Sequence, residues 1–318
     1  MRVSVCVGVF NGIQFIGEQL ECIRRQTRKP DEVILCDDGS TDGTREFLRQ
    51  YCGEHPDTDG WKLIYQKENK GFPKNYYDAM SRCTGDLIFL ADQDDIWDLQ
   101  KVARMCQVME RDPKIRLLGC TFGLIDGQDE AIHTLMAPAP QSGGGELRKV
   151  TAGEVFYKCE WPGMVLAYRN DWYRDKVMAC GGQEFNEAIV HIPHDFLLCA
   201  RAAEEDGFFQ LPERLAYHRR HENNAGGEEH RIGRLLKKDR KQREIEEYAL
   251  ILDWFARGNI MQTTEGKGAL LRKREVMKAR YDALMSGKFR NVIRNAWKYR
   301  KEVRPATFVC DLFIVKQR

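Results

Sequence analysis

The chain has 318 residues, of which 42% are hydrophobic and 31% are charged, which suits one large α/β domain with an appendage or two ordinary domains. Its net charge of +2 conceals an asymmetry, because residues 1–227 carry a balance of −9 and residues 228–318 a balance of +11. No apolar run approaches the roughly 18 residues of a membrane-spanning helix, and the first residues are too strand-like for a secretory signal, so we expect a cytosolic protein.

The first 130 residues alternate between strand and helix patterns. Continuous apolar runs predict buried strands, and apolar residues three and four positions apart predict the helices between them. The expected strands are Val3–Val9, Val33–Cys36, Trp61–Gln66 and Asp86–Ala91, and the expected helices are Gln14–Gln26, a segment ending near Tyr51, and Phe72–Cys83. This alternation predicts an α/β fold with a mainly parallel sheet, in which ligands bind beyond the carboxyl ends of the strands.

The remainder divides into a mixed segment and a helical one. Between about residues 117 and 217, short apolar pieces such as Leu117–Phe122 and Met164–Tyr168 alternate with loops. Beyond residue 227, apolar side chains fall on helical stripes, one from Ile245 to Phe255 and one from Phe289 to Trp297. We therefore predict one domain over residues 1–227 and a basic α-helical region over residues 228–318.

The eleven cysteines are scattered and form no C-x-x-C pair, so zinc-ribbon and thioredoxin-like chemistry have no support. Cys6, Cys36 and Cys120 lie inside apolar runs, where a free thiol packs as a small hydrophobic group. We expect reduced thiols, as in a cytosolic protein.

The strand predicted over Asp86–Ala91 is followed by four carboxylates, those of Asp92, Asp94, Asp95 and Asp98. Two like charges about 4 Å apart repel by about 1 kcal/mol in water, and several-fold more near a protein surface. A divalent cation that also binds a diphosphate offsets this repulsion, since Mg²⁺ is typically held by one or two carboxylates and by phosphate oxygens. We favour this role for Asp92 and Asp94, whereas Asp95 and Asp98 also suit caps of the following helix.

A second acidic segment, Asp37-Asp38-Gly39-Ser40-Thr41-Asp42-Gly43, follows the strand Val33–Cys36. A carboxylate at a strand end can accept a hydrogen bond from a base imide or a ribose hydroxyl, and Gly39 permits a tight turn. Residues 40–42 also suit a turn and a helix cap. A phosphatase with an aspartate nucleophile would need a D-x-D spacing here, which this segment lacks.

Together these segments resemble family 2 glycosyltransferases of the GT-A (Rossmann-like) fold over roughly residues 1–227. The resemblance is carried, in chain order, by Val7–Gly12, Gln26-Thr27, Asp37–Thr44, Asn69–Gly71 and Gly85–Trp97. The form Asp92-Gln93-Asp94-Asp95-Ile96-Trp97, with His194–Phe196 and Tyr217–Asn224, most resembles bacterial rhamnosyltransferases of surface-polysaccharide assembly.

The resemblance implies an inverting transfer to a hydroxyl of a glycan or lipid-linked acceptor, with Mg²⁺ or Mn²⁺ as cofactor. The implied donor is dTDP-β-L-rhamnose, and a UDP-hexose or UDP-N-acetylhexosamine is the alternative. The implied donor-side roles are base contacts from Gly8, Phe10 and Asn11, an imide contact from Asp38, a ribose contact from Asp92 and metal binding by Asp94. His221 would be a further metal ligand or a phosphate contact. The first strand ends in Gly8-Val9, where the family often has a hydroxyl residue, and this departure leaves base selectivity open.

On the acceptor side, the resemblance makes Asp195 the general base. A positioned carboxylate can take the proton of the acceptor hydroxyl, and the preceding Ile192-Pro193 led us to expect Asp195 at a cleft rim rather than inside a helix. The alternative is a helix N-cap. His194 would support Asp195. The segment Trp161-Pro162-Gly163 resembles the family's acceptor-side loop, in which Trp161 would stack on a sugar or belong to the core.

Two competing functions and several partners stay open at this point. A sugar nucleotidylyltransferase would need an N-terminal glycine-rich phosphate-binding segment, which the chain lacks. The intact carboxylates of Asp38, Asp92, Asp94 and Asp195 speak against a non-catalytic nucleotide-sugar-binding component of a polysaccharide assembly complex. The basic region suggests contact with the inner face of the cytoplasmic membrane, a homo-oligomer, or a solvated helical face. No nucleic-acid-binding module is recognisable. The membrane hypothesis is motivated by Arg234, Lys237, Lys238, Arg290, Arg294, Lys298, Arg300 and Lys301, near Phe289, Ile293 and Trp297.

Overall fold

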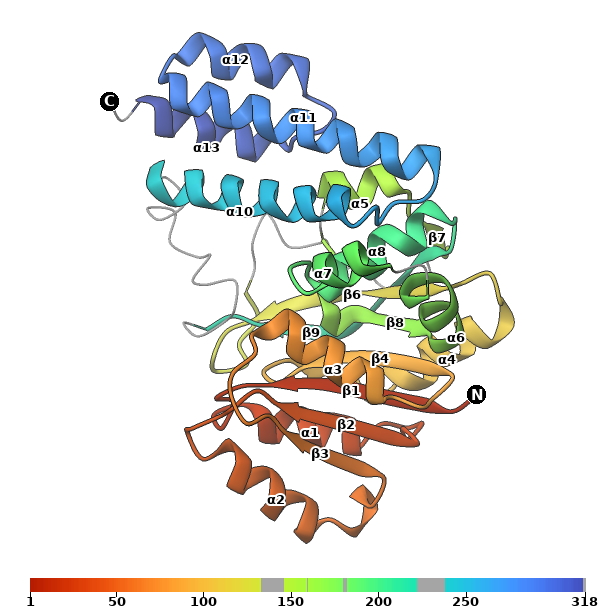
Figure 1. Ribbon diagram of the computed structural model, residues 1–318. Helices are drawn as coiled ribbons and strands as arrows, with labels where there is room; N and C mark the ends of the chain where they lie inside the picture. The colour runs from red at the N-terminus through yellow and green to blue at the C-terminus, as the bar shows by residue number, and fades with distance from the viewer. Residues whose placement is uncertain (133–145, 159, 180–181, 222–237, 317–318) are drawn as a thin grey trace.

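The computed structural model describes residues 1–132, 146–158, 160–179, 182–221 and 238–316, and these form an α/β structure around one curled β-sheet (Figure 1). Strands follow the order β3-β2-β1-β4-β8-β6-β9-β5, and β7 pairs with β9 outside this row. The strands are β1 (Val3–Val9), β2 (Glu32–Asp37), β3 (Trp61–Tyr65), β4 (Leu87–Asp92), β5 (Ile96–Trp97), β6 (Leu117–Ile125), β7 (Arg148–Lys149), β8 (Leu166–Arg169) and β9 (Phe208–Arg219).

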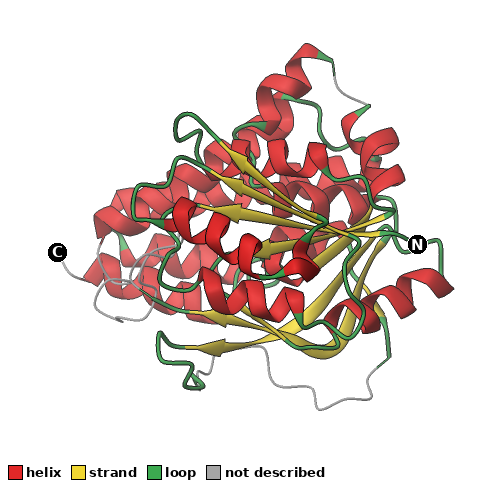
Figure 2. Ribbon diagram, turned by 90° about the horizontal axis from the view of Figure 1, so that it is seen from below, coloured by secondary structure: helices red, strands yellow, loops and turns green. Residues whose placement is uncertain are grey.

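Helices cover both sides of the sheet (Figure 2). In the first two thirds of the chain they are α1 (Ile16–Arg24), α2 (Thr44–Glu54), α3 (Phe72–Arg82), α4 (Lys101–Arg111), α5 (Ala152–Lys158), α6 (Asn170–Trp172), α7 (Gln183–Ile189) and α8 (His194–Glu204), with short helical segments η1 (Pro56–Thr58), η2 (Gly163–Val165) and η3 (Tyr173–Met178). The elements predicted for residues 1–92 are confirmed, and their ends differ from the prediction by a few residues.

The parallel half of the sheet consists of β3, β2, β1 and β4. Its two inner strands, β1 and β2, are buried almost throughout, which is why their sequences are continuous apolar runs rather than alternating ones. The three thiols expected in apolar runs are buried here and in β6, and every cysteine in the described part of the chain is free.

The second half of the sheet is mixed. The strand β8 pairs antiparallel with β4 and β6, and β9 pairs parallel with β6 but antiparallel with the two-residue strand β5. The strand β5 follows the acidic segment after β4 directly, and its Ile96 pairs with Tyr217 of β9. This pairing carries the end of β9 to the carboxyl end of β4.

The C-terminal region is helical, as predicted, and the boundary expected at residues 227/228 lies outside the described residues. Its helices are α10 (Lys238–Arg257), α11 (Thr264–Ser286), α12 (Phe289–Lys298) and α13 (Pro305–Lys316). The stripe of α10 joins the main core, where Phe255 packs on Phe156 of α5 and Phe196 of α8. The Glu204 carboxylate of α8 accepts the backbone N–H of Thr263 at 2.9 Å, next to the start of α11. These contacts anchor α10 and the start of α11 to α5 and α8 of the sheet-containing part of the fold.

Candidate active site

The carboxyl ends of β1, β2 and β4 lie side by side because the three strands are parallel and in register. Gly8 of β1 pairs with Cys36 of β2 and with Asp92 of β4. The acidic segments that follow β2 and β4 therefore flank the same end of β1, as the sequence predicted.

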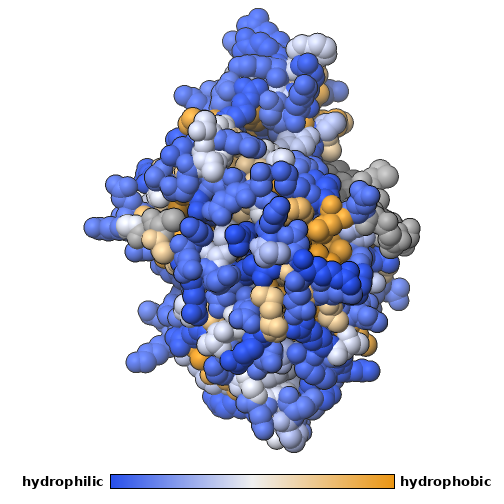
Figure 3. All heavy atoms as spheres, turned by 90° about the vertical axis from the view of Figure 1, so that its right-hand side faces the viewer, coloured by the Kyte–Doolittle hydropathy of each residue, from blue (hydrophilic) through white to orange (hydrophobic). Residues whose placement is uncertain are grey.

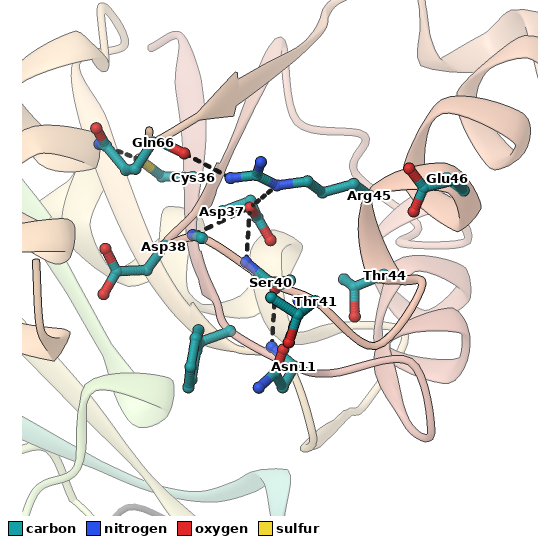
Figure 4. Close-up of polar contacts among 12 residues, drawn as sticks. Asn11, Cys36, Asp37, Asp38, Ser40, Thr41, Thr44, Arg45, Glu46 and Gln66 are labelled. Carbon is teal, nitrogen blue, oxygen red and sulfur yellow. Dashed lines mark hydrogen bonds and ion pairs between the residues drawn. The ribbon is translucent and has the colours of Figure 1, made fainter. Parts of the chain in front are cut away.

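The two neighbouring aspartates at the end of β2 have different surroundings (Figure 4). Asp37 is fully buried, and its Oδ2 lies 2.5 Å from Nε of Arg45 while also accepting the backbone N–H of Ser40 at 3.2 Å. The Asp38 carboxylate points away from this ion pair. Asp37 therefore shapes the turn, in which Gly39 has the left-handed φ of 85° that favours glycine.

Asp38 connects the end of β2 to the start of α3. Its Oδ1 accepts the backbone N–H of Lys70 at 2.7 Å, and its Oδ2 accepts that of Gly71 at 2.9 Å. A carboxylate offers about four lone-pair sites, so these two bonds leave room for a donor on a ligand.

The loop after β1 is fixed by side chains from both acidic segments. The Gln93 amide accepts the backbone N–H of Phe10 at 2.8 Å and donates to its carbonyl at 2.9 Å. Asn11 has a left-handed φ of 48°, and its side chain accepts the backbone N–H of Thr41 at 2.9 Å. The backbone of Phe10 is thereby held beside the acidic segment that follows β4, and its side chain is 43% exposed.

Gly8 has a packing role in addition to the base contact that we predicted. A Cβ atom at this position would lie 2.5 Å from the ring of Tyr76 in α3. The Tyr76 hydroxyl donates to the carbonyl of Ala91 at 2.7 Å and to the Asp92 carboxylate. The absence of a side chain at Gly8 thus lets Tyr76 reach the end of β4 and hold Asp92.

Three carboxylates lie at the end of β4 or just after it, and each has its own partner. Asp92 bonds Tyr76 as described, and Oδ2 of Asp94 lies 2.8 Å from Nε2 of His221. Oδ1 of Asp95 lies 2.9 Å from Nδ1 of His218, while its buried Oδ2 has no partner among the described residues. The pairing of β5 with β9 brings both histidines here. Asp95 is therefore not the helix cap that we considered, whereas Asp98 accepts the backbone N–H of Gln100 beside the start of α4.

The electrostatics of this cluster follow from burial and crowding. Burial, together with the nearby charges of Asp95 and Asp94, raises the pKa of Asp92 to about 7. Burial lowers the pKa of His218, but the hydrogen bond to Asp95 and the charges of Asp95 and Asp92 together outweigh this effect, and the pKa is raised overall. Arg219 adds a buried positive charge, and its Nε donates to the carbonyl of Asp94 at 2.8 Å.

A second group lies on the other side of Tyr76. The imidazole of His194 stacks on the Tyr76 ring with centroids 3.8 Å apart, and both of its nitrogens lack a partner among the described residues. Burial lowers the pKa of His194 to about 3, so the ring is neutral at physiological pH. A Cβ at Gly163 would lie 2.9 Å from Nε2 of His194, so these two predicted acceptor-side residues are in contact.

Asp195 is half-buried next to this stack. Burial raises its pKa to about 6, although the backbone N–H groups of Phe196 and Gly163 donate to it and favour the charged form. Our expectation that Asp195 lies outside a helix was wrong, because it is the second residue of α8, with Pro193 at the N-cap. Proline has a fixed φ and no N–H, so it fits at the start of a helix. His194 and Asp195, which follow it, therefore lie in the first turn of α8.

Trp161 lies in the core rather than on an open surface. Its side chain is 6% exposed and packs edge-on against Phe208, with ring centroids 5.1 Å apart. We therefore do not include its ring in a sugar-stacking site. Sequence reasoning also left Tyr76, Gln93 and His218 without roles. Tyr76 contacts Asp92 and Gln93 contacts Phe10, which are predicted site residues, and His218 contacts Asp95 of the same acidic segment.

A sequence profile of glycosyl transferase family 2 matches residues 4–165, slightly more than half of the chain. The chain belongs to this family. It is 34% identical over 125 residues to EpsE of Bacillus subtilis, provisionally named a glycosyltransferase, which covers 39% of this chain and 44% of EpsE. It is 32% identical over 143 residues to TuaG of the same organism, provisionally named a teichuronic acid biosynthesis glycosyltransferase, which covers 44% of this chain and 54% of TuaG. The matches span about half the length of these relatives.

Solved structures show the same fold. TarS residues 1–349 of S. aureus, solved with UDP, superimpose with a TM-score of 0.59 at 16% identity, covering 100% of this chain and 90% of that one. The mannosyltransferase PcManGT of Pyrobaculum calidifontis, solved with GDP-Man and Mn²⁺, gives 0.59 at 15% identity, covering 99% and 86%. At this identity the likeness establishes the GT-A fold. In the described part of the chain, no helix is long and apolar enough to cross a membrane.

Proposed function

We propose that this protein transfers a sugar from a nucleoside-diphosphate donor to an acceptor hydroxyl in a single, inverting displacement. The observation that carries the proposal is the placement of two carboxylate groups around one aromatic stack. The Asp92–Asp95 cluster lies at the Tyr76 hydroxyl, and Asp195 follows the His194 ring that covers Tyr76. The first group suits a donor diphosphate, and the second suits the hydroxyl that attacks it.

We propose that Asp94 and His221 hold Mg²⁺ or Mn²⁺. Their facing atoms are 2.8 Å apart and both side chains are 13% exposed, so one ion could contact both. The described residues contain no group of three His, Cys, Asp or Glu side chains placed to hold a metal ion, so diphosphate oxygens would complete the coordination. An imidazole nitrogen beside a carboxylate suits Mn²⁺ better than Mg²⁺, which prefers oxygen. When bound, such an ion neutralises charge that develops on the leaving diphosphate.

Asp195 would act as the general base. Its pKa of about 6 leaves it ionised at neutral pH, yet close enough to the working pH to accept a proton efficiently. The N–H groups of Gly163 and Phe196 orient the carboxylate. The neutral ring of His194 adds no charge that would attract the carboxylate away from the acceptor.

The donor that we propose is dTDP-β-L-rhamnose, on the resemblance of the acidic segment and the His194–Phe196 segment to rhamnosyltransferases. A UDP-hexose or UDP-N-acetylhexosamine is the second candidate, because structures of the similar TarS contain UDP and UDP-GlcNAc. Asp38, Phe10 and Asn11 would bind the base, Asp92 would contact the ribose, and thymine and uracil present the same imide to Asp38. We propose a glycan or lipid-linked acceptor of polysaccharide assembly, in keeping with the name of TuaG.

The test is a thermal-shift panel of dTDP-, UDP- and GDP-sugars with and without Mn²⁺, since a ligand at 100 times its Kd stabilises the native state by about 2.7 kcal/mol. We expect one donor to raise the melting temperature only when Mn²⁺ is present. Asp94→Asn should remove that dependence on Mn²⁺ and stop transfer. The matched control is Asp98→Asn, a carboxylate of the same segment that contacts the start of α4. No shift with any donor would refute the proposed donor binding, and a shift without transfer would support a non-catalytic nucleotide-sugar-binding role. Full turnover by Asp94→Asn would refute the metal assignment.

A further inference from the structure

The helix α12 has two apolar stripes, and only one of them is packed. Val292 is buried, Ala296 packs on the small cluster shared by α11 and α13, and the Asn295 amide donates to the carbonyl of Ala279 in α11 at 2.5 Å. These contacts fix the orientation of α12 on α11. Figure 1 shows α12 as the outermost element, on the side of α11 away from the sheet.

The second stripe consists of Phe289, Ile293 and Trp297, which lie four residues apart and therefore on one face of the helix. Their side chains are 49%, 49% and 74% exposed. The sequence pattern had placed them on one stripe with Val292, and the structure separates the two sets. On the face shown in Figure 3, hydrophilic residues predominate around a smaller apolar patch. Three large exposed apolar side chains in one row of a single helix are therefore a candidate interaction surface.

Positive charge surrounds this exposed stripe. Residues 288–301 contain six lysines and arginines and no acidic residue: Lys288, Arg290, Arg294, Lys298, Arg300 and Lys301. Within the described ranges, only Lys298 among them has a carboxylate partner, Glu275 at 3.2 Å. Arg290 and Arg294 follow each other at a four-residue spacing, next to the apolar stripe. Arg234 and Lys237, which also motivated the sequence-based hypothesis, lie outside the described residues.

We infer that α12 is an interfacial helix that docks the protein onto an anionic phospholipid surface. Phenylalanine, isoleucine and tryptophan on one face can enter the boundary between headgroups and acyl chains, where the indole ring is favoured. Each cation near such a surface strengthens binding by about fivefold. A protein partner with an acidic groove would match the charge, but three apolar residues in one row, bordered by cations and open to solvent, match a planar interface with a charged outer layer.

The test is co-sedimentation of the full chain with vesicles of phosphatidylcholine alone or of phosphatidylcholine and phosphatidylglycerol in equal amounts. We expect pelleting only with the anionic vesicles, and release when salt rises from about 0.1 M to about 1 M, because the Debye length falls from about 10 Å to about 3 Å. Arg290→Gln with Arg294→Gln should weaken binding by about 25-fold. Phe289→Ser with Trp297→Ser should weaken it at least about tenfold.

Matched controls separate docking from general effects of charge and hydrophobicity. Arg111→Gln with Lys114→Gln removes the same charge near the end of α4, and Leu271→Ser removes an apolar side chain that is 62% exposed on α11. Both should bind vesicles as the unaltered chain does. The Asp94→Asn variant should also bind the vesicles. Its binding would show that docking does not depend on the proposed sugar transfer.

A direct measurement locates the helix. When the vesicles contain brominated acyl chains, part of the tryptophan fluorescence of the bound protein should be quenched. Trp297→Phe should remove the quenched part, and the variant should still pellet with the anionic vesicles. The inference is refuted if the intact chain does not pellet at low salt, or if the control variants lose binding as strongly as the α12 variants. It is also refuted if light scattering shows an oligomer that Phe289→Ser with Trp297→Ser converts to a monomer, because a second copy would then cover the stripe.

Discussion

Replacing Asp195 by asparagine should abolish sugar transfer and stabilise the fold at the same time. The pKa of Asp195 is raised by burial to about 6 from its ordinary value of 3.8. A carboxyl group whose pKa is higher in the folded protein than in the unfolded chain is more easily ionised when unfolded. Ionisation at neutral pH therefore favours unfolding, and an uncharged amide removes this cost.

The size of the effect follows from the pKa difference of about two units. Each unit corresponds to about 1.36 kcal/mol, which gives about 3 kcal/mol as an upper value. The single amide oxygen retains only part of the bonding to the N–H groups of Phe196 and Gly163, so we expect a gain of about 1–3 kcal/mol. At about 2–4 °C for each kcal/mol, the melting temperature at pH 7.5 should rise by several degrees.

The assay combines calorimetric unfolding at several pH values, titration of the donor, and release of the nucleoside diphosphate with acceptor present. The stabilisation should vanish as the pH falls from about 6 to about 4, where the native carboxyl is neutral as well. Donor affinity should be unchanged, and transfer should fall by about 100- to 10,000-fold. The matched control is Asp171→Asn, since Oδ1 of Asp171 accepts the N–H of Trp172 at 2.7 Å, as Oδ1 of Asp195 does from Phe196.

A helix-capping role would produce the opposite stability result. If Asp195→Asn lowers the melting temperature at pH 7.5, the carboxylate stabilises the start of α8, and its burial is not the dominant effect. If donor affinity collapses while the fold is intact, Asp195 belongs to the donor site. The first outcome would refute the stability argument from burial, and the second would refute the assignment of Asp195 as the base.

Three further predictions concern the pH profile and the packing of the site. The transfer rate, measured as kcat/KM between pH 5 and pH 8, should fall about tenfold per pH unit below about pH 6, because protonated Asp195 cannot accept a proton. Gly8→Ala should lower the free energy of unfolding, measured with denaturant, by about 1–3 kcal/mol, because its methyl group would lie 2.5 Å from the Tyr76 ring. An unchanged free energy of unfolding would mean that the ring can move aside. Arg45→Met should lower the free energy of unfolding by about 3 kcal/mol in the same measurement, because it leaves the buried Asp37 carboxylate without its cation. An unchanged value would mean that the backbone N–H groups of the turn are sufficient partners for Asp37.

The fold of residues 1–92 could be predicted because each element has one clear local pattern. Val3–Val9 is a continuous apolar run, and the acidic segments interrupt the pattern where strands end. The sheet from β6 to β9 could not be derived in the same way. The strand β9 is twelve residues long and irregular against β6, and β5 contains only two residues, so no local period marks either pairing.

The site was predicted to the extent that it lies at the ends of regular strands. The positions of Asp38, Asp92 and Asp94 follow from that rule. The partners of the carboxylates do not, because His221 reaches Asp94 through a pairing between segments 127 residues apart. Tyr76 looks like any aromatic on a helix stripe, and only its closeness to Gly8 and Asp92 reveals its role. The helical position of Asp195 was missed because Ile192-Pro193 suggests a loop but also suits the residues before a helix.

The arrangement after β4 explains how a fold can tolerate three neighbouring carboxylates. Each carboxylate meets a different donor from a different element: Asp92 meets Tyr76 of α3, Asp95 meets His218 of β9, and Asp94 meets His221 just beyond β9. These contacts only partly offset the repulsion, because burial and mutual charge still raise the pKa of Asp92 and of Asp95. Asp95 is buried, whereas the side chain of Asp94 is 13% exposed, so a cation that approaches Asp94 from the solvent would relieve the same repulsion. The cation that we propose at Asp94 would therefore reduce the repulsion that the contacts with Tyr76, His218 and His221 leave.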